Sequence, residues 1–157
     1  MIVVYNCFGG THSSVIAASL HVGRLPADRL PTPEEIERLP FYDRIPKRMV
    51  GSLHYIGTDE DDNEVYALGI GKHKDIVRKA ILSLLKLYNL EEQILLVDAS
   101  KKLNIITRIG GFTARQLGIV SVGRPLTVYG VRKGYFGFVN LVQETKLKIK
   151  KKTKITR

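Results

Sequence analysis

The hydrophobic residues of the chain occur in short continuous runs separated by stretches with helical spacing. Residues 2–6 form a continuous apolar run with β-branched side chains, and Gln93–Val97 forms a second one. Runs of this kind are typical of strands that are buried on both faces of a parallel sheet. We therefore predict strands at both places and a further strand at Ile119–Val122.

Helical patterns lie between these runs. The predicted helices are Ser13–Val22, Pro33–Leu39, Asp75–Tyr88, Leu103–Leu117 and a last helix from about Val131 to the start of the basic tail. The second helix is expected because Thr32 can cap it and Pro33 fits its first turn. In the third helix one side carries the apolar residues Ile76, Val77, Ile81, Leu84 and Leu87.

Two further strand candidates, Leu53–Ile56 and Glu64–Leu68, flank the polar segment Gly57–Asn63 and predict a hairpin. Strands that alternate with helices indicate an α/β fold. The pattern as a whole predicts a three-layer, open, mainly parallel sheet with helices on both faces and this one β-hairpin.

The composition limits the class of protein. A chain of 157 residues suits one domain, and 44% hydrophobic residues are enough for a core, which excludes wholesale disorder. No window approaches the ~18 uninterrupted apolar residues that a membrane span needs. The lone Cys7 excludes an internal disulfide framework, and the N-terminus lacks the features of a signal peptide. We therefore expect a cytoplasmic protein.

Positive charge is concentrated at the C-terminus. Without the seven Lys and Arg residues of the last 12 positions, the formal net charge of +10 falls to +3. We therefore divide the chain into a single α/β domain, residues 1–145, and a basic C-terminal extension, residues 146–157. The extension is expected to be solvated and frayed, and nonspecific contact with polyanions is the alternative interpretation.

The segment from Cys7 to Ser14 follows the first predicted strand and leads into the first predicted helix. Gly9 and Gly10 let successive amides turn into one concavity, and the helix adds unpaired N–H groups. The polar side chains of this anion-binding loop are Thr11, His12, Ser13 and Ser14. The alternative is a tight turn in which Ser13 or Ser14 caps the helix.

Other residues are candidates to complete such a site. Gly71 and Lys72 lie between a strand and a helix and predict a second backbone nest with a cation beside it. Arg124 follows the predicted strand at Ile119–Val122, where it could stabilise negative charge. Asp98 follows an apolar strand as an acid, a metal ligand or a helix cap. The histidines have no convincing metal spacing with Cys7, so we predict no metal site.

The loop resembles the phosphate loop of low-molecular-weight tyrosine phosphatases, in which a cysteine, five residues, arginine and serine precede a helix. By this resemblance Cys7 matches the nucleophile, Gly9 a loop glycine, and Ser14 the hydroxyl that steadies the thiolate. The arginine position is Ser13, and no Asp-Pro pair follows later in the chain to match the general acid of that family.

The loop is also similar in spacing to the P-loop of nucleotide triphosphatases, over Asn6 to Ser13. Asn6, Thr11 and His12 replace the two glycines and the lysine of that motif. Ile94–Asp98 resembles the apolar strand that ends in a magnesium-associated aspartate. A magnesium ion is therefore expected only if a nucleotide binds.

Over roughly residues 1–145 the chain is most similar to a small domain family of unknown function from spore-forming Firmicutes. The segments that carry the resemblance are Tyr5–Ser14, Gly57–Asp59 leading to Glu64–Tyr66, Gly110–Phe112 and Gly123–Pro125. The resemblance implies a bacterial cytoplasmic setting with a distribution linked to sporulation. It implies no catalytic activity.

Two functional hypotheses follow. The first is a protein that binds a phosphate-bearing small molecule at the Cys7–Ser14 loop, in which phosphoryl transfer or hydrolysis would use Cys7 as nucleophile, Arg124 as charge stabiliser and Asp98 as proton donor. The second is a noncatalytic regulatory or interaction protein that retains a degenerate phosphate loop. The sequence leaves open whether the protein is an enzyme, its cofactors and its oligomeric state.

Overall fold

A four-stranded sheet forms the centre of the molecule. A computed structural model describes residues 1–100 and 120–155, with side chains over 1–100 and 125–153. The strands are β1 (Ile2–Cys7), β2 (Leu53–Thr58), β3 (Glu64–Gly69) and β4 (Ile94–Asp98), in the order β2-β3-β1-β4. β1 is parallel to β3 and β4, and β2 is antiparallel to β3. The predicted mainly parallel α/β sheet and its hairpin are confirmed.

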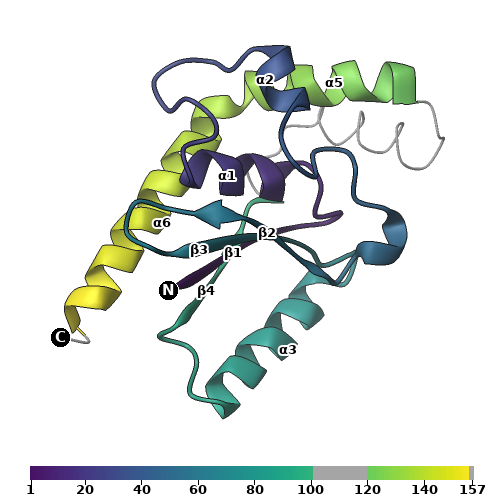
Figure 1. Cartoon of the computed structure of the whole chain (residues 1–157). Coiled ribbons are helices and arrows are strands. Elements are labelled where there is room, and N and C mark those ends of the chain that lie inside the picture. The colour runs from purple at the N-terminus through teal and green to yellow at the C-terminus, as the bar shows by residue number, and fades with distance from the viewer. Residues whose placement is uncertain (101–119, 156–157) are drawn as a thin grey trace.

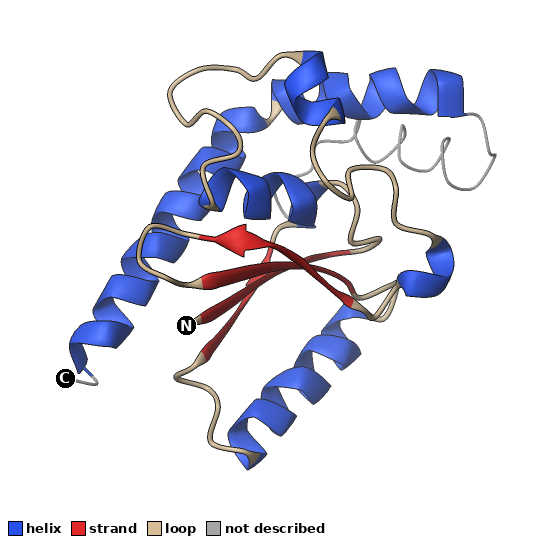
Figure 2. Cartoon of the chain, in the orientation of Figure 1, coloured by secondary structure: helices blue, strands red, loops and turns tan. Residues whose placement is uncertain are grey.

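One face of the sheet is covered by two layers of helix. Helix α1 (Ser13–His21) lies directly on this face and is buried along its whole length. Helix α6 (Tyr135–Ile155) packs beside α1 and reaches Tyr5 of β1 through Thr145, whereas α5 (Val120–Lys133) and the short α2 (Pro33–Glu37) lie on the outer side of α1 (Figures 1 and 2). The main core forms here, because α1 presents apolar side chains both to the sheet and to α6.

The opposite face carries helix α3 (Lys74–Leu87). Val77 and Ile81 pack on a smaller cluster formed by β1, β3 and β4. The sequence predicted that Ile76, Leu84 and Leu87 share that side of the helix, but the structure leaves all three exposed. The apolar arc of α3 is therefore wider than the surface that the sheet covers.

The ends of α2 follow the local sequence. Thr32 accepts a hydrogen bond from the Glu35 amide, and the Glu35 side chain accepts one from the Thr32 amide. This reciprocal capping box, with Pro33 in the first turn, confirms the predicted short helix. A 3₁₀ turn, Lys47–Met49, then leads into β2.

The C-terminal third differs from the prediction. Residues 120–122 belong to α5 and not to a strand, because α5 continues into Val128 and Val131, whose helical spacing places both in the core. The last helix starts at Tyr135, and its basic end is helical as far as Ile155 instead of frayed. The predicted helix Leu103–Leu117 lies outside the described residues. None of the described helices has the length and apolar character needed to cross a membrane.

The order of the strands brings two loops together at the carboxyl edge of the sheet. The chain leaves β1 toward α1 on one face and leaves β3 toward α3 on the other (Figure 1). In open α/β sheets, ligands bind where the connections after two neighbouring strands leave toward opposite faces of the sheet. The loop that begins at Cys7 therefore occupies the usual binding position of the fold.

Candidate functional site

The Cys7 thiol lies at the base of the loop between β1 and α1. Its Sγ atom accepts a hydrogen bond from the Gly10 amide at 3.2 Å. The Ser14 hydroxyl, in the first turn of α1, lies 3.2 Å from the same sulfur. A thiolate at this position would receive both N–H and O–H donors, which is how a protein holds a sulfur nucleophile.

The start of α1 keeps unused donors beside this sulfur. His12 is the N-cap residue, and its side chain makes no capping bond, nor does Ser13 or Ser14 replace it in that role. In the described part of the chain, the amides of Gly9, Thr11 and His12 have no protein acceptor. The Ser13 hydroxyl is fully buried and also lacks a partner. These groups could donate hydrogen bonds to an oxyanion.

The second predicted nest is used by the protein itself. The Gly71 amide donates to the Phe8 carbonyl at 2.9 Å, and the Ile70 amide donates to the Cys7 carbonyl at 3.0 Å. The Lys72 side chain is exposed. Gly71 therefore ties the two loops together, and its amide does not point into a free concavity.

Close contact between the two loops explains their glycines. A Cβ atom on Gly10 would lie 2.6 Å from the main-chain nitrogen of Gly69, and one on Gly69 would lie 2.8 Å from the carbonyl carbon of Gly9. Gly10 also has a φ of 75°, a backbone angle that residues other than glycine rarely adopt. The loop conformation around Cys7 thus depends on glycine for both space and backbone angle.

A segment that the sequence did not indicate, residues 41–45, covers the loop. The Asp43 carboxylate lies 3.2 Å from Nε2 of His12, and both side chains are largely buried. The Thr11 hydroxyl donates to the Phe41 carbonyl at 2.8 Å, and the Asp43 amide donates to the Thr11 carbonyl. Phe41 and Asp43 both have positive φ, 65° and 53°. Strained backbone held by such contacts clusters at functional sites.

Nothing in the sequence near Asp43 predicted its position beside His12. The two residues are 31 positions apart, and the segment from Phe41 to Ile45 has no periodic pattern. The available signal was the presence of Pro40 and Pro46 on either side of it, because proline favours irregular connections over regular helices and strands. Only the tertiary contacts identify this segment as the cover of the Cys7 loop.

Asp98 lies at the carboxyl edge but on the α3 side of the sheet. Its carboxylate accepts hydrogen bonds from the Ser100 amide and hydroxyl and lies 3.7 Å from Lys74 of α3. Burial pushes the pKa of Asp98 upward, but these hydrogen bonds and the charges of Lys74 and Arg78 lower it below its usual value. Asp98 is therefore ionised at neutral pH. It is also separated by the sheet from the Cys7 thiol, which lies on the α1 side.

A buried asparagine lies between these groups. Asn6 accepts a hydrogen bond from Arg78 of α3 at 3.2 Å, and Arg78 also donates to the Leu96 carbonyl. The Nδ2 donor of Asn6 is buried without a partner. Arg78 is thus an arginine that the structure brings to the end of β1, and the sequence analysis did not single it out.

Arg124 lies in α5 instead of directly after a strand, and its side chain lies outside the described residues. The described residues contain no group of three or more His, Cys, Asp or Glu side chains placed to hold a metal ion. Asp98, for which the sequence left open the roles of acid, metal ligand and helix cap, has Ser100 and Lys74 as its neighbours.

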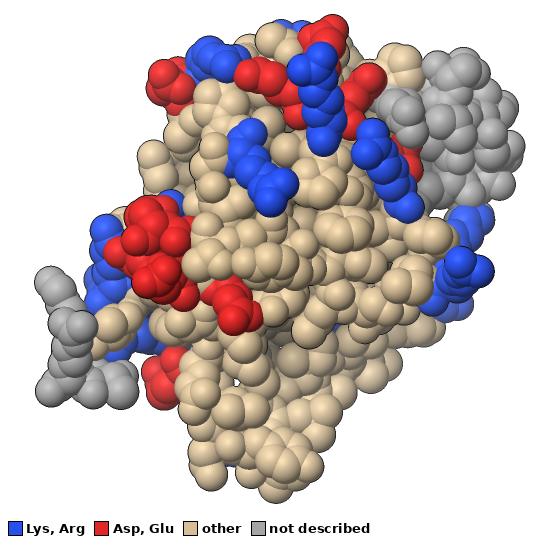
Figure 3. Space-filling model, viewed as in Figure 1, with Lys and Arg blue, Asp and Glu red and all other residues tan. Residues whose placement is uncertain are grey.

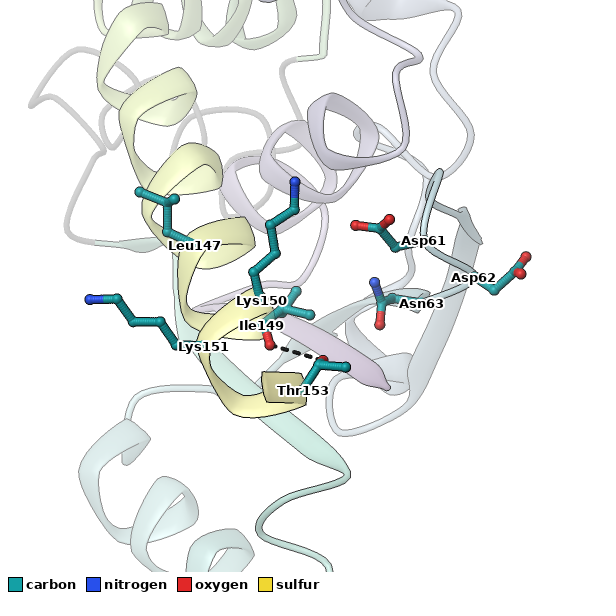
Figure 4. Close-up of a pocket in the computed structure, with 8 residues that line it drawn as sticks. All are labelled: Asp61, Asp62, Asn63, Leu147, Ile149, Lys150, Lys151 and Thr153. Carbon is teal, nitrogen blue, oxygen red and sulfur yellow. Dashed lines mark hydrogen bonds between the residues drawn. The ribbon is translucent and has the colours of Figure 1, made fainter. Parts of the chain in front are cut away.

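A cavity of about 650 Å³ lies at the other end of the molecule, between the β2–β3 turn and the end of α6 (Figure 4). Its lining residues are Asp61, Asp62, Asn63, Leu147, Ile149, Lys150, Lys151 and Thr153. The lining combines acidic and basic side chains without a nucleophile. We base the candidate site on the loop around Cys7, because that loop places a thiol next to hydrogen-bond donors. The lining of the cavity offers no such combination.

Comparison with known proteins agrees with the resemblance seen in the sequence. A family model described as "Protein of unknown function (DUF3189)" matches residues 2–147. No curated protein and no solved structure matches the chain.

Proposed function

The chain belongs to this family of unknown function, and we propose that its Cys7–Ser14 loop binds the phosphate group of a small molecule. The observation that carries the proposal is the environment of the Cys7 sulfur. It contacts the Gly10 amide and the Ser14 hydroxyl at 3.2 Å each. The unused amides of Gly9, Thr11 and His12 next to it supply the donors that an oxyanion needs.

If the site is catalytic, Cys7 is the nucleophile. Its thiolate attacks phosphorus, so that an S–P bond forms while the P–O bond to the leaving group breaks, and the leaving oxygen takes a proton. A water molecule then cleaves the S–P bond, releases inorganic phosphate and restores the thiolate. The loop amides would stabilise the charge on the equatorial oxygens, the role that we predicted for Arg124.

We assign the proton transfer to His12 in place of Asp98. The His12 ring belongs to the loop itself and is held by Asp43. A carboxylate beside a histidine fixes the orientation of the ring. Asp98 has a lowered pKa, and its hydrogen bonds bind it to the α3 side of the sheet. A magnesium ion enters the proposal only if the ligand is a nucleotide.

The test is the alkylation of Cys7 by iodoacetamide, with and without inorganic phosphate. We expect phosphate to slow the reaction, because it would occupy the donors next to the sulfur. Ser14→Ala should lower the reactivity of the thiol, since it removes the hydroxyl 3.2 Å from Sγ. Ser19→Ala is the matched control, because Ser19 is a buried serine of the same helix whose hydroxyl has no partner. Equal labelling with and without phosphate would contradict the proposal.

The alternative is a noncatalytic protein that binds the same ligand class for regulation or interaction. The near-complete burial of Cys7, which is 4% exposed, favours it, because a substrate must reach the sulfur. Turnover of p-nitrophenyl phosphate distinguishes the two. An enzyme loses turnover on Cys7→Ser, whereas a binding protein shows none and retains phosphate binding in that variant.

Contact with polyanions through the C-terminal lysines stays a separate proposal. Lys148, Lys150 and Lys151 are exposed on α6, whereas Lys146 pairs with Glu60. Replacing the three exposed lysines by glutamine should remove the salt-dependent part of binding to nucleic acid. We also propose a cytoplasmic setting as part of the phosphate-site proposal, because a reactive Cys7 must stay reduced. Cell fractionation tests this location.

A further inference from the structure

Helix α3 presents a row of large apolar side chains to solvent. Ile76, Leu84 and Leu87 are 68%, 54% and 72% exposed, and Tyr88 directly after the helix is 68% exposed. Spacings of three, eight and eleven residues place the three helical residues on one side of α3. Single exposed leucines are ordinary, but a continuous row of this kind marks an interaction surface.

The row continues onto the edge strand of the sheet. Leu53 and Tyr55 of β2 are 55% and 51% exposed. The Tyr55 ring lies 5.4 Å from the ring of Tyr66, which packs against the apolar cluster under α3. Leu53 and Tyr55 therefore face the same side of the sheet as α3.

The orientation of α3 shows that the two parts adjoin. Arg78 points to β1 and β4, since it donates to Asn6 and to the Leu96 carbonyl. Ile76, Leu84 and Leu87 lie on the side of the helix opposite to Arg78. Leu84 therefore lies on the flank of α3 toward β2, where Leu53 and Tyr55 are exposed, and Ile76 and Leu87 continue from it onto the outer surface of the helix. We call these residues the β2–α3 surface.

The side chains of the β2–α3 surface carry no charge although the chain is strongly basic, and the nearby Glu64 carboxylate accepts a hydrogen bond from Tyr66. No Lys, Arg, Asp or Glu occurs from Val50 to Gly57, and Lys79 and Lys86 of α3 lie outside its apolar row. Figure 3 shows that this face is largely uncharged along β2 and down to α3. Two copies of a chain with a net charge of +10 repel each other. They can associate only where charged side chains are kept out of the contact.

We propose that the β2–α3 surface binds a second copy of the chain through a two-fold axis. β2 lies at the edge of the sheet, so alternate main-chain groups point away from β3 and have no partner strand in the described part of the chain. Antiparallel pairing with the β2 strand of a second copy satisfies these groups. A lipid surface would leave them unpaired in an apolar medium, which is why we favour a protein partner.

The test is the molar mass in solution, measured by sedimentation velocity over a range of concentrations. We expect a species of about twice 17.6 kDa. Tyr55→Lys and Leu84→Glu each place a charge in the surface and should weaken dimerisation by at least about tenfold. Both residues are more than half exposed, so the monomer should stay folded, which circular dichroism checks. Leu147→Glu is the matched control, because Leu147 is 60% exposed on α6.

Hydrogen exchange distinguishes this dimer from another one. Amides of residues 53–58 should exchange more slowly as the dimer forms. A dimer in which these amides are unprotected, or which survives Tyr55→Lys and Leu84→Glu, overturns the proposal. A wild-type chain that stays monomeric up to about 100 µM, well above the ~1 µM affinities of ordinary weak complexes, also overturns it.

The remaining outcome is binding to membranes. A monomer that floats with vesicles of phosphatidylcholine and phosphatidylserine, and loses that property on Leu84→Glu, would show that lipid is the occupant. That result would also overturn the proposal. Neither result depends on Cys7, so the dimer and the phosphate site succeed or fail separately.

Discussion

The two faces of the sheet are covered in opposite ways. On one face α1 is buried along its entire length among the sheet, α2, α5 and α6. On the other face α3 lies at the surface, with half of its apolar arc on the sheet and half in solvent. The first face is thus covered within the chain, whereas the second leaves large apolar side chains in solvent, which is why we proposed that it binds a second copy.

Two isoleucines test this difference most directly. Ile16 of α1 is 0% exposed and Ile76 of α3 is 68% exposed. Ile16→Ala should lower the free energy of unfolding by about 2–5 kcal/mol, because it leaves a cavity in the main core. Ile76→Ala should change it by no more than about 0.5 kcal/mol. Urea unfolding of the monomer measures both, and equal losses would show that α3 is covered within the chain.

The junction between the faces gives the next effect. Gly10→Ala should destabilise the fold by roughly 2–3 kcal/mol, because its Cβ would lie 2.6 Å from the Gly69 nitrogen in addition to the strained φ. Gly23 has almost the same φ, 73°, but nothing within 4 Å of the added Cβ. Gly23→Ala should therefore cost only about 1 kcal/mol. A similar cost at both glycines in thermal unfolding would mean that the two loops do not touch.

A smaller effect arises from the buried histidine at the end of α1. Nε2 of His21 lies 2.9 Å from Asp59, and Nδ1 lies 2.8 Å from the Tyr5 hydroxyl. Burial lowers the pKa of His21, although the hydrogen bond to Asp59 opposes this. A neutral ring protonated on Nε2 donates to Asp59 and accepts from the Tyr5 hydroxyl through Nδ1, whereas a protonated ring has no nitrogen left to accept.

The sign of the resulting pH dependence follows. Because the folded pKa is below the ordinary value of 6.5, the unfolded chain binds more protons as the pH falls below about 6.5. Stability is therefore fully present above that pH and should decrease as the pH falls toward 5.5, by at most about 1.4 kcal/mol per pH unit. His21→Gln should flatten this decrease, and His73→Gln, at an exposed position, should not. Urea unfolding at several pH values provides the measurement; an unchanged slope in His21→Gln would assign the effect to other groups.

The smallest effect concerns the basic end of α6. Lys146 contacts both carboxylate oxygens of Glu60 at 2.8 Å, but the Glu60 side chain is 60% exposed. Lys146→Ala should cost no more than about 1 kcal/mol, and less in high salt. Ile149, one turn further, is 4% exposed, so Ile149→Ala should cost about 2–5 kcal/mol. A negligible cost at Ile149 would favour the predicted boundary after residue 145.

The sequence by itself determined the elements whose signals are local. The apolar run at β1, the glycine loop and the small-residue helix after it, the β2–β3 hairpin and the capped α2 all depend on neighbours a few residues apart. The candidate phosphate loop was found for the same reason, since Cys7, Gly10 and Ser14 lie within eight consecutive residues. Periodicity and turn chemistry suffice where the relevant contacts are close in sequence.

The tertiary structure alone decided the features that depend on distant contacts. The β-branched residues Val120 and Val122 became helical because Val128 and Val131 of the same helix pack in the core. Only folding brought Asp43 to His12, engaged the Gly71 amide with the Phe8 carbonyl and divided the apolar arc of α3 between sheet and solvent. The physical reason is common to all of these. A side chain or amide has one local preference, but its partner is chosen by which strands and helices lie next to it.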